Sequence, residues 1–387
     1  MTESATAYTK QSDSSLAGRE LGERLMETLT GAPDAVILFA SSQYDYEGLL
    51  RSLTQSCNPG ALVGCSSAGE FITGQQGEGA ASAVALRSKD MQFTAALGKG
   101  LHESRKTAAT QLASSFRGVS ENLFPHRAAL LLADALAGYT DELIEELSLQ
   151  TSGNYRFFGG GAGDDAKFSR THVFCGTKAY TDAVVALEML SRKQIGIGVS
   201  HGWIPSGEPL RVTEVKGMQL ISLNAAPAVE AFEEHAERTG QTFNQKDPVP
   251  FFLHNVLGID TGNGYKLRVP LAVNEDGSIA CASDIPDGAT LRIMSTSSAS
   301  ASEAAVTATS SALRQLGENT PQVALFFDCV ATRLRMGNEF GEEMAALQQT
   351  LGGIPYAGCN TYGQIARSEG QFSGFHNCTA TVAVIPE

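Results

Sequence analysis

The stretch Val63-Gly64-Cys65-Ser66-Ser67-Ala68-Gly69-Glu70-Phe71 recurs along the chain and therefore indicates how the molecule is built. A near copy, Ala357-Gly358-Cys359-Asn360-Thr361-Tyr362-Gly363-Gln364-Ile365, lies close to the C-terminal end. A looser copy, Phe158-Gly159-Gly160-Gly161-Ala162-Gly163-Asp164-Asp165, lies between them. Each copy is a turn framed by glycines, and turns recurring in similar surroundings predict a repeated structural unit.

The surroundings of the turns repeat as well. An apolar run and then a helix-like stretch precede each turn, and an apolar strand follows it. Similar spacings separate the apolar run from the turn: Leu38 to Gly64, Leu131 to Gly159, and Phe326 to Gly358. A crossover of this length joins parallel strands. We therefore predict an α/β fold, in which units of strand, helix, Gly turn and strand form mixed sheets flanked by helices.

Two domains are expected. Residues 1–14 are polar and read as a tail, and residues 16–30 show helical spacing of apolar side chains up to Gly31. We assign residues 1–30 to this tail and first helix, residues 31–216 to a first domain and residues 217–387 to a second. The boundary lies at a turn near Gly217.

Composition restricts the function. The chain has 387 residues, a net charge of −14 and no basic cluster, which argues against nucleic acid or an anionic membrane as the main partner. The sequence shows neither a signal peptide nor an apolar run long enough to span a membrane. Its seven cysteines form no C-x-x-C pair, so we expect free thiols in a reducing cytoplasm and no structural zinc site.

Catalytic motifs are incomplete. Residues 161–166 match G-x-G-x-x-A, but the residues after them look extended, whereas a dinucleotide fingerprint opens a helix. Residues 64–69 miss the G-x-S-x-G spacing of a nucleophile elbow. Cys65 and Cys359 occupy equivalent places in their repeats, and small core cysteines explain them better than duplicated nucleophiles. We therefore predict a protein that is not an enzyme.

The glycine turns have two interpretations. Glycine lets a backbone approach a ligand or adopt a positive φ, but it also lets neighbouring segments pack closely. If the turns form a small-molecule pocket, polar groups beside them would orient the ligand. The candidate ligand-binding residues are Cys65, Ser66, Gly69, Glu70, Gly161, Asp164, Trp203, Asn360, Thr361, Gly363 and Arg367.

Three histidines stand in apolar or Gly-rich settings, namely His201, His254 and His376. Such a histidine can ligate a metal or haem iron, although a hydrogen-bonded core histidine is commoner. His201 lies in Ser200-His201-Gly202-Trp203, which ends a Gly-interrupted apolar strand.

Taken together, several motifs resemble the FIST family of bacterial sensory proteins, whose two parts are called FIST N and FIST C. The resemblance covers nearly the whole chain and implies a cytoplasmic sensor of small ligands such as amino acids. It rests on Phe39-Ala40-Ser41-Ser42, the stretch from Gly64 to Glu70, residues 158–165, the His201 motif, and the stretch from Ala357 to Gln364.

One branch of that family resembles the chain in length and in lacking a fused output domain. Its members bind haem, sense nitric oxide and regulate a partner histidine kinase or a cyclic-di-GMP enzyme. The resemblance implies an axial histidine, for which His201 is the first candidate and His254 the second. The haem would be non-covalent, because the chain lacks C-x-x-C-H.

Two further hypotheses stay open. The chain is either an iron-free sensor that binds an amino acid or related metabolite at the Gly turns, or an enzyme that uses Cys65 or Cys359. Association with a second copy of the chain is also left open by the sequence.

Overall fold

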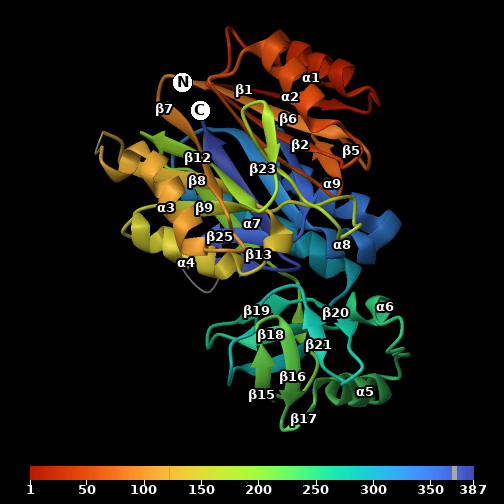
Figure 1. Ribbon diagram of the computed structural model, residues 1–387. Coiled ribbons are helices and arrows are strands. Elements are labelled where there is room, and N and C mark those ends of the chain that lie inside the picture. The colour runs from red at the N-terminus through yellow and green to blue at the C-terminus, as the bar shows by residue number, and fades with distance from the viewer. Residues whose placement is uncertain (122, 368–372) are drawn as a thin grey trace.

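The computed structural model describes residues 1–121, 123–367 and 373–387, without the side chains of residues 298, 367 and 373. Three six-stranded mixed sheets form one body, and residues 204–295 form a second, smaller body that we call the inserted unit. In Figure 1 the inserted unit, in green and teal, lies below the larger body, and both chain ends lie in the larger body. The predicted α/β fold with mixed sheets and flanking helices is confirmed.

The larger body consists of three repeats, and each of them begins with a strand and a helix that precede the predicted unit. The first repeat contains β1 (Thr2–Thr9), α1 (Ser14–Thr28), β2 (Ala35–Ala40), α2 (Tyr46–Cys57), β3 (Ala61–Ser66), β4 (Glu70–Ile72), β5 (Gln75–Gly77) and β6 (Ala81–Ser88). The second contains β7 (Met91–Lys99), α3 (Arg105–Ser115), β8 (His126–Ala133), α4 (Thr140–Gln150), β9 (Arg156–Gly161), β10 (Val173–Cys175), β11 (Lys178–Tyr180) and β12 (Ala183–Ser191). The third contains β13 (Gly196–Ser200), α7 (Ser298–Gln315), β23 (Pro321–Cys329), α8 (Val330–Met336), α9 (Phe340–Leu351), β24 (Tyr356–Thr361), β25 (Gln364–Arg367), β26 (Ser373–His376) and β27 (Ala380–Pro386).

The predicted parallel strand pairs form, and the structure gives their register. The parallel pairs are β2 with β3, β8 with β9, and β23 with β24. In these pairs Gly64 lies opposite Leu38, Gly159 opposite Leu131, and Gly358 opposite Phe326. A Cβ added to Gly64, Gly159 or Gly358 would stand 2.1, 2.1 or 1.8 Å from the carbonyl oxygen of that residue. For these three glycines, close packing of neighbouring strands is therefore the physical requirement.

Each repeat donates a hairpin of two strands to the sheet of another repeat, an exchange that the sequence did not indicate. Strand β4 of the first repeat pairs with β24 of the third, and β25 of the third pairs with β9 of the second. Strand β10 of the second repeat pairs with β3 of the first and closes the cycle. The three Gly turns are therefore brought to one place, because each turn precedes an exchanged strand in the chain.

Apolar side chains fill the space between the sheets and under the helices. Phe39, Leu132 and Phe327, from the three parallel pairs, share one fully buried central core. Helices α1 and α2 pack together over the first sheet, α3 and α4 over the second, and α7 and α9 over the third. Within the described residues, the helices are too short or too polar to cross a membrane.

Two expectations need correction. Residues 2–9 are not a tail but the strand β1, whose whole length pairs with β6 and is largely buried. The boundary expected between residues 216 and 217 falls inside a hairpin, because Lys216 at the end of β15 pairs with Gln219 at the start of β16. The chain leaves the larger body after β13 and returns to it at α7.

The inserted unit is a sheet with two helices. It contains β14 (Ile204–Pro205), β15 (Leu210–Lys216), β16 (Gln219–Leu223), β17 (Ala226–Pro227), α5 (Ala228–Thr239), α6 (Val249–Phe252), β18 (Val256–Asp260), β19 (Tyr265–Arg268), β20 (Pro270–Val273), β21 (Ile279–Cys281) and β22 (Thr290–Ser295).

Candidate functional site

The three Gly turns are joined directly by backbone hydrogen bonds. The N–H of Ala68 donates to the carbonyl of Asn360 (3.0 Å), and the N–H of Asn360 donates back to Gly69 (2.8 Å). In the same way Gly163 donates to Ser66 (2.9 Å), and Gly161 and Gly363 are joined at 2.8 Å. The predicted turns are thus one structural junction, although they lie far apart in the sequence.

A cavity of about 270 Å³ opens where the first and third turns meet, and we call it the turn cavity. The strands β4 and β24 deliver Glu70 and Asn360 to it, because these strands pair across the junction. Helix α8, which follows β23, delivers Arg333. Other residues that line it are Phe71, Gln76, Glu78, Asn338 and Phe340.

Glu70 is the buried acid of the turn cavity, with 1% of its surface exposed. The hydroxyl of Ser67 and the N–H of Ala80 donate to its carboxyl group, at 2.5 and 3.0 Å. Burial raises the pKa of Glu70 to about 8, even though these hydrogen bonds work in the opposite direction. Glu70 is therefore largely protonated at neutral pH, and a nearby cation would ionise it.

Asn360 and Arg333, which both line the turn cavity, each carry a buried hydrogen-bonding atom that has no partner among the described residues. The amide nitrogen of Asn360 donates to Asp328 (3.1 Å), but its Oδ1 is buried without a partner among the described residues. The Nε of Arg333 is likewise buried and unpaired there, while its Nη1 pairs with the exposed Glu78. Leaving a buried polar atom unpaired costs about 1–3 kcal/mol, so such atoms call for an explanation.

The structure places the other candidate ligand residues elsewhere. Cys65 and Cys359 lie in the central core, where their thiols contact each other. Ser66 and Thr361 hydrogen-bond within the junction, to His172 and Asp328. The carboxylate of Asp164 is saturated by hydrogen bonds from its own loop and Tyr362. Gly161 links two turns, Gly363 lines a different cavity, and the side chain of Arg367 lies outside the described residues.

Trp203 and the candidate haem ligands lie away from the turn cavity. Trp203 packs in the apolar cluster between the two bodies, with its ring 5.8 Å from the Arg335 guanidinium. The Nε2 of His201 donates to the carbonyl of Tyr265 (3.1 Å), and its Nδ1 accepts from the N–H of Trp203 (3.2 Å). His254 is exposed. Within the described residues, no three His, Cys, Asp or Glu side chains gather in a group that could hold a metal ion.

These environments do not fit an axial haem ligand. An iron ligand needs one imidazole nitrogen for the metal, and backbone groups already use both nitrogens of His201. The haem plane also needs an apolar cavity, whereas His254 lies on the surface.

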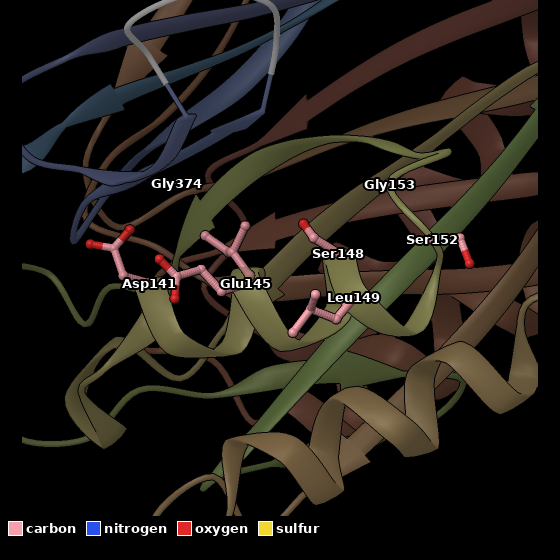
Figure 2. Close-up of a pocket in the computed structure, with 8 residues that line it drawn as sticks. Asp141, Glu145, Ser148, Leu149, Ser152, Gly153 and Gly374 are labelled. Atoms are coloured by element: carbon pink, nitrogen blue, oxygen red, sulfur yellow. The ribbon is translucent and has the colours of Figure 1, made fainter.

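A larger cavity of about 540 Å³ lies beside α4 and is drawn in Figure 2. The figure shows Glu145, Ser148 and Leu149 along one side of the helix. Asp141, at the start of α4, already accepts from Lys266 and Arg268 of the inserted unit, both at 2.6 Å. Arg268 and Lys266 hold the pKa of Asp141 below its usual value, although burial works against them. This carboxylate therefore joins the two bodies, and it is not available to a ligand.

Sequence reasoning missed part of the turn cavity. Arg333 was not recognised because α8 has no counterpart among the helices of the first repeat, so repetition gave no signal for it. Gln76 lies in the exposed strand β5 and Asn338 in the short 3₁₀ helix Gly337–Glu339 before α9, where polar residues are common on any surface. Only the adjacency of Glu70 and Asn360 to glycine turns could be read from the sequence.

Comparisons with known proteins find both parts of the family that the sequence resembles. The sequence model of the FIST N domain matches residues 34–226, and that of the FIST C domain matches residues 228–367. An uncharacterized protein of Mycobacterium tuberculosis is 25% identical over 92% of both chains. An uncharacterized protein of Mycobacterium bovis is 25% identical over 96% of both. The solved structure of the cyanuric acid hydrolase from A. caulinodans covers 99% of both chains at 6% identity with a TM-score of 0.34, which is too low to support an argument.

Proposed function

Because this chain belongs to the FIST family, whose domains are sensors in signal transduction and in general non-catalytic, we propose that it senses a small polar metabolite in the turn cavity. A sensor of this kind passes its signal to a partner protein. The histidine kinase or cyclic-di-GMP enzyme expected from the resemblance stays a prediction.

The observation that carries this proposal is the pair of unpaired buried atoms, Oδ1 of Asn360 and Nε of Arg333, in one cavity. A ligand with an N–H or O–H donor would satisfy the first, and a ligand with a carboxylate would satisfy the second. The cavity volume of about 270 Å³ suits a molecule of metabolite size.

The chemistry of the cavity favours an amino acid or a related zwitterion. The carboxylate of such a ligand would bind Arg333 and displace the exposed Glu78 from it. The ammonium group would donate to Asn360 and lie near Glu70. Because a nearby cation lowers the pKa of a buried carboxyl group, binding would ionise Glu70 and release a proton.

A thermal-shift screen of amino acids and related metabolites tests the proposal, followed by calorimetry on Asn360→Ala and Arg333→Gln. Losing one charged or two neutral hydrogen bonds should weaken binding by about 10- to 100-fold. Arg24→Gln is a matched control, because Arg24 does not line the turn cavity but a neighbouring cavity beside β1, which shares Gln76 with it. Binding that neither turn-cavity substitution weakens would place the ligand elsewhere and refute the proposal.

Haem and nitric oxide sensing remains a prediction from the resemblance, and the described environments of His201 and His254 do not support it. An absorption spectrum of protein produced with ample haem, before and after reduction and nitric oxide, decides it. A stoichiometric Soret band that shifts with the gas would replace the metabolite proposal with the haem sensor.

A further inference from the structure

Cys329 and Cys378 meet between the larger body and the inserted unit. Cys329 ends β23, and Cys378 lies in the turn between β26 and β27, where its φ of 50° is unusual for a residue other than glycine. Both are at most 4% exposed and belong to the apolar cluster that contains Trp203 and Met294. The third repeat thus brings together two thiols that stand far apart in the sequence.

Several donors converge on the sulfur of Cys329. The thiol and backbone of Cys378 lie beside it, as do the backbone of Ala331 and the side chain of Gln364, and all of them lower the pKa of the Cys329 thiol. The hydrogen bond from the Cys378 thiol is the main cause that lowers the pKa of the Cys329 thiol to about 7, against the effect of burial. A thiolate is the nucleophilic form of cysteine, so Cys329 is the activated member of the pair.

The surrounding charges are consistent with this assignment. Burial raises the pKa of Asp328 well above its usual value and that of Glu343 to about 8, and both shifts favour the neutral acid. The positive charge of Arg335 works against the rise in the pKa of Cys378. The shifts of these two acids therefore limit the negative charge beside a thiolate at Cys329.

A small apolar cavity of about 90 Å³ reaches Cys329, and we call it the thiol cavity. Its lining includes Val269 and Val330, and at its edge Leu136, Phe168 and Leu271 are 39%, 47% and 38% exposed. Exposed apolar side chains of this size around one opening are unusual on a protein surface. Cys378 does not line the thiol cavity, so a reagent that enters meets Cys329 first.

We propose that Cys329 and Cys378 are a redox-active dithiol, which a hydroperoxide entering the thiol cavity oxidises to a disulfide. The Cys329 thiolate attacks the outer peroxide oxygen, the O–O bond breaks, and the remainder leaves as an alcohol, or as water from hydrogen peroxide. The Cys378 sulfur then attacks the resulting sulfenic acid at sulfur, and the hydroxyl group leaves as water. Two thiols and one hydroperoxide give one disulfide, one alcohol and one water.

Cys65 and Cys359 provide an internal control. They also form a contacting pair, but both are fully buried in the central core, and the described cavities are not lined by either. Burial raises the pKa of Cys359 well above its usual value. Contact between thiols is common to the two pairs, whereas access and activation distinguish Cys329 and Cys378.

The test treats the reduced full-length protein with hydrogen peroxide or cumene hydroperoxide, alkylates the remaining thiols, and maps disulfide-linked peptides without reduction. We expect the wild-type protein to lose the mass of two hydrogen atoms and to yield a Cys329–Cys378 linked peptide. In Cys378→Ser we expect a sulfenic acid on Cys329 that dimedone traps, and in Cys329→Ser neither product. Cys65→Ser should behave like the wild type.

The two oxidants distinguish the sources of the hydroperoxide. If the Cys329–Cys378 disulfide forms faster with cumene hydroperoxide, the physiological oxidant is an apolar hydroperoxide. If it forms faster with hydrogen peroxide, the oxidant is hydrogen peroxide itself. The mapping uses the wild-type chain, so a variant that fails to fold does not affect it. Oxidation of the half-buried Cys175, or linkage of Cys65 to Cys359, while Cys329 and Cys378 remain fully alkylatable would overturn the proposal.

Discussion

The amide oxygen of Asn360 lies directly over Gly69, so close that a Cβ added to Gly69 would stand 2.6 Å from it. Gly69 also has a φ of 136°, which side-chain-bearing residues rarely adopt. The glycine of the first repeat thus makes room for a polar side chain of the third. This contact fixes the unpaired oxygen of Asn360 at the wall of the turn cavity.

Gly69→Ala should therefore damage the turn cavity. The new methyl group would push Asn360 aside, and the strained backbone would cost about 1–3 kcal/mol of unfolding free energy. We expect ligand affinity to fall by about tenfold or more, as calorimetry would measure, because Asn360 loses its position. Gly74→Ala is the matched control, since Gly74 has a φ of 75° but nothing within 4 Å. Equal affinities in the two variants would contradict this account.

The close contacts of Gly64, Gly159 and Gly358 predict that each is required for folding. An alanine at any of them would force the two parallel strands apart, because the obstacle is a backbone carbonyl that cannot rotate away. We expect a loss of about 3 kcal/mol or more in urea unfolding, since overpacking of this kind belongs to the severe class. Gly207→Ala, where the nearest atom would be 3.5 Å away, should change stability little. Similar unfolding midpoints for all four variants would refute the argument.

The turn glycines explain why most of the fold was predictable. A position that approaches a carbonyl on the neighbouring strand requires glycine, so it is recognisable in the sequence, and here such a glycine occurs in all three repeats. The exchange of β4, β10 and β25 between repeats has no recognisable sequence motif, because the partner of each strand depends on how the three sheets assemble. Strand β1 was missed because its sequence, TESATAYT, is polar although it is largely buried.

The candidate site was predictable only in part for a related reason. Glu70 and Asn360 adjoin glycine turns, so their position beside a junction could be inferred. Arg333 lies in a helix with no repeated counterpart, and only the folded chain shows that it lines the same cavity as Asn360. His201 was favoured for its apolar setting, but its hydrogen bonds to Tyr265 and Trp203 depend on the tertiary structure.

Glu70 should make stability depend on pH. Its pKa in the folded protein, about 8, lies above its ordinary value of 4.5, so the folded state holds a proton that the unfolded state loses. The protonated Glu70 contributes fully to the free energy of unfolding below about pH 4.5. This contribution is lost progressively between about pH 4.5 and about pH 8, by at most about 1.4 kcal/mol per pH unit. The unfolding temperature of Glu70→Gln, compared with that of the wild type, should therefore increase as pH rises through this window. The exposed Glu342→Gln is the control, and a Glu70→Gln curve parallel to the wild-type curve would contradict the prediction.

Asp141 should hold the inserted unit to the larger body. Its buried carboxylate accepts from Lys266 and Arg268 of β19 and from the N–H of Phe375, so Asp141→Asn leaves two cations without their counterion. Removing one partner of a buried ion pair costs about 3–5 kcal/mol, and we expect a loss of this order in the unfolding free energy. Hydrogen exchange should also quicken in β19, because its anchor is lost. Glu145→Gln, an exposed change on the same helix, should leave both measurements unchanged, and equal exchange in the two variants would show that Asp141 does not join the bodies.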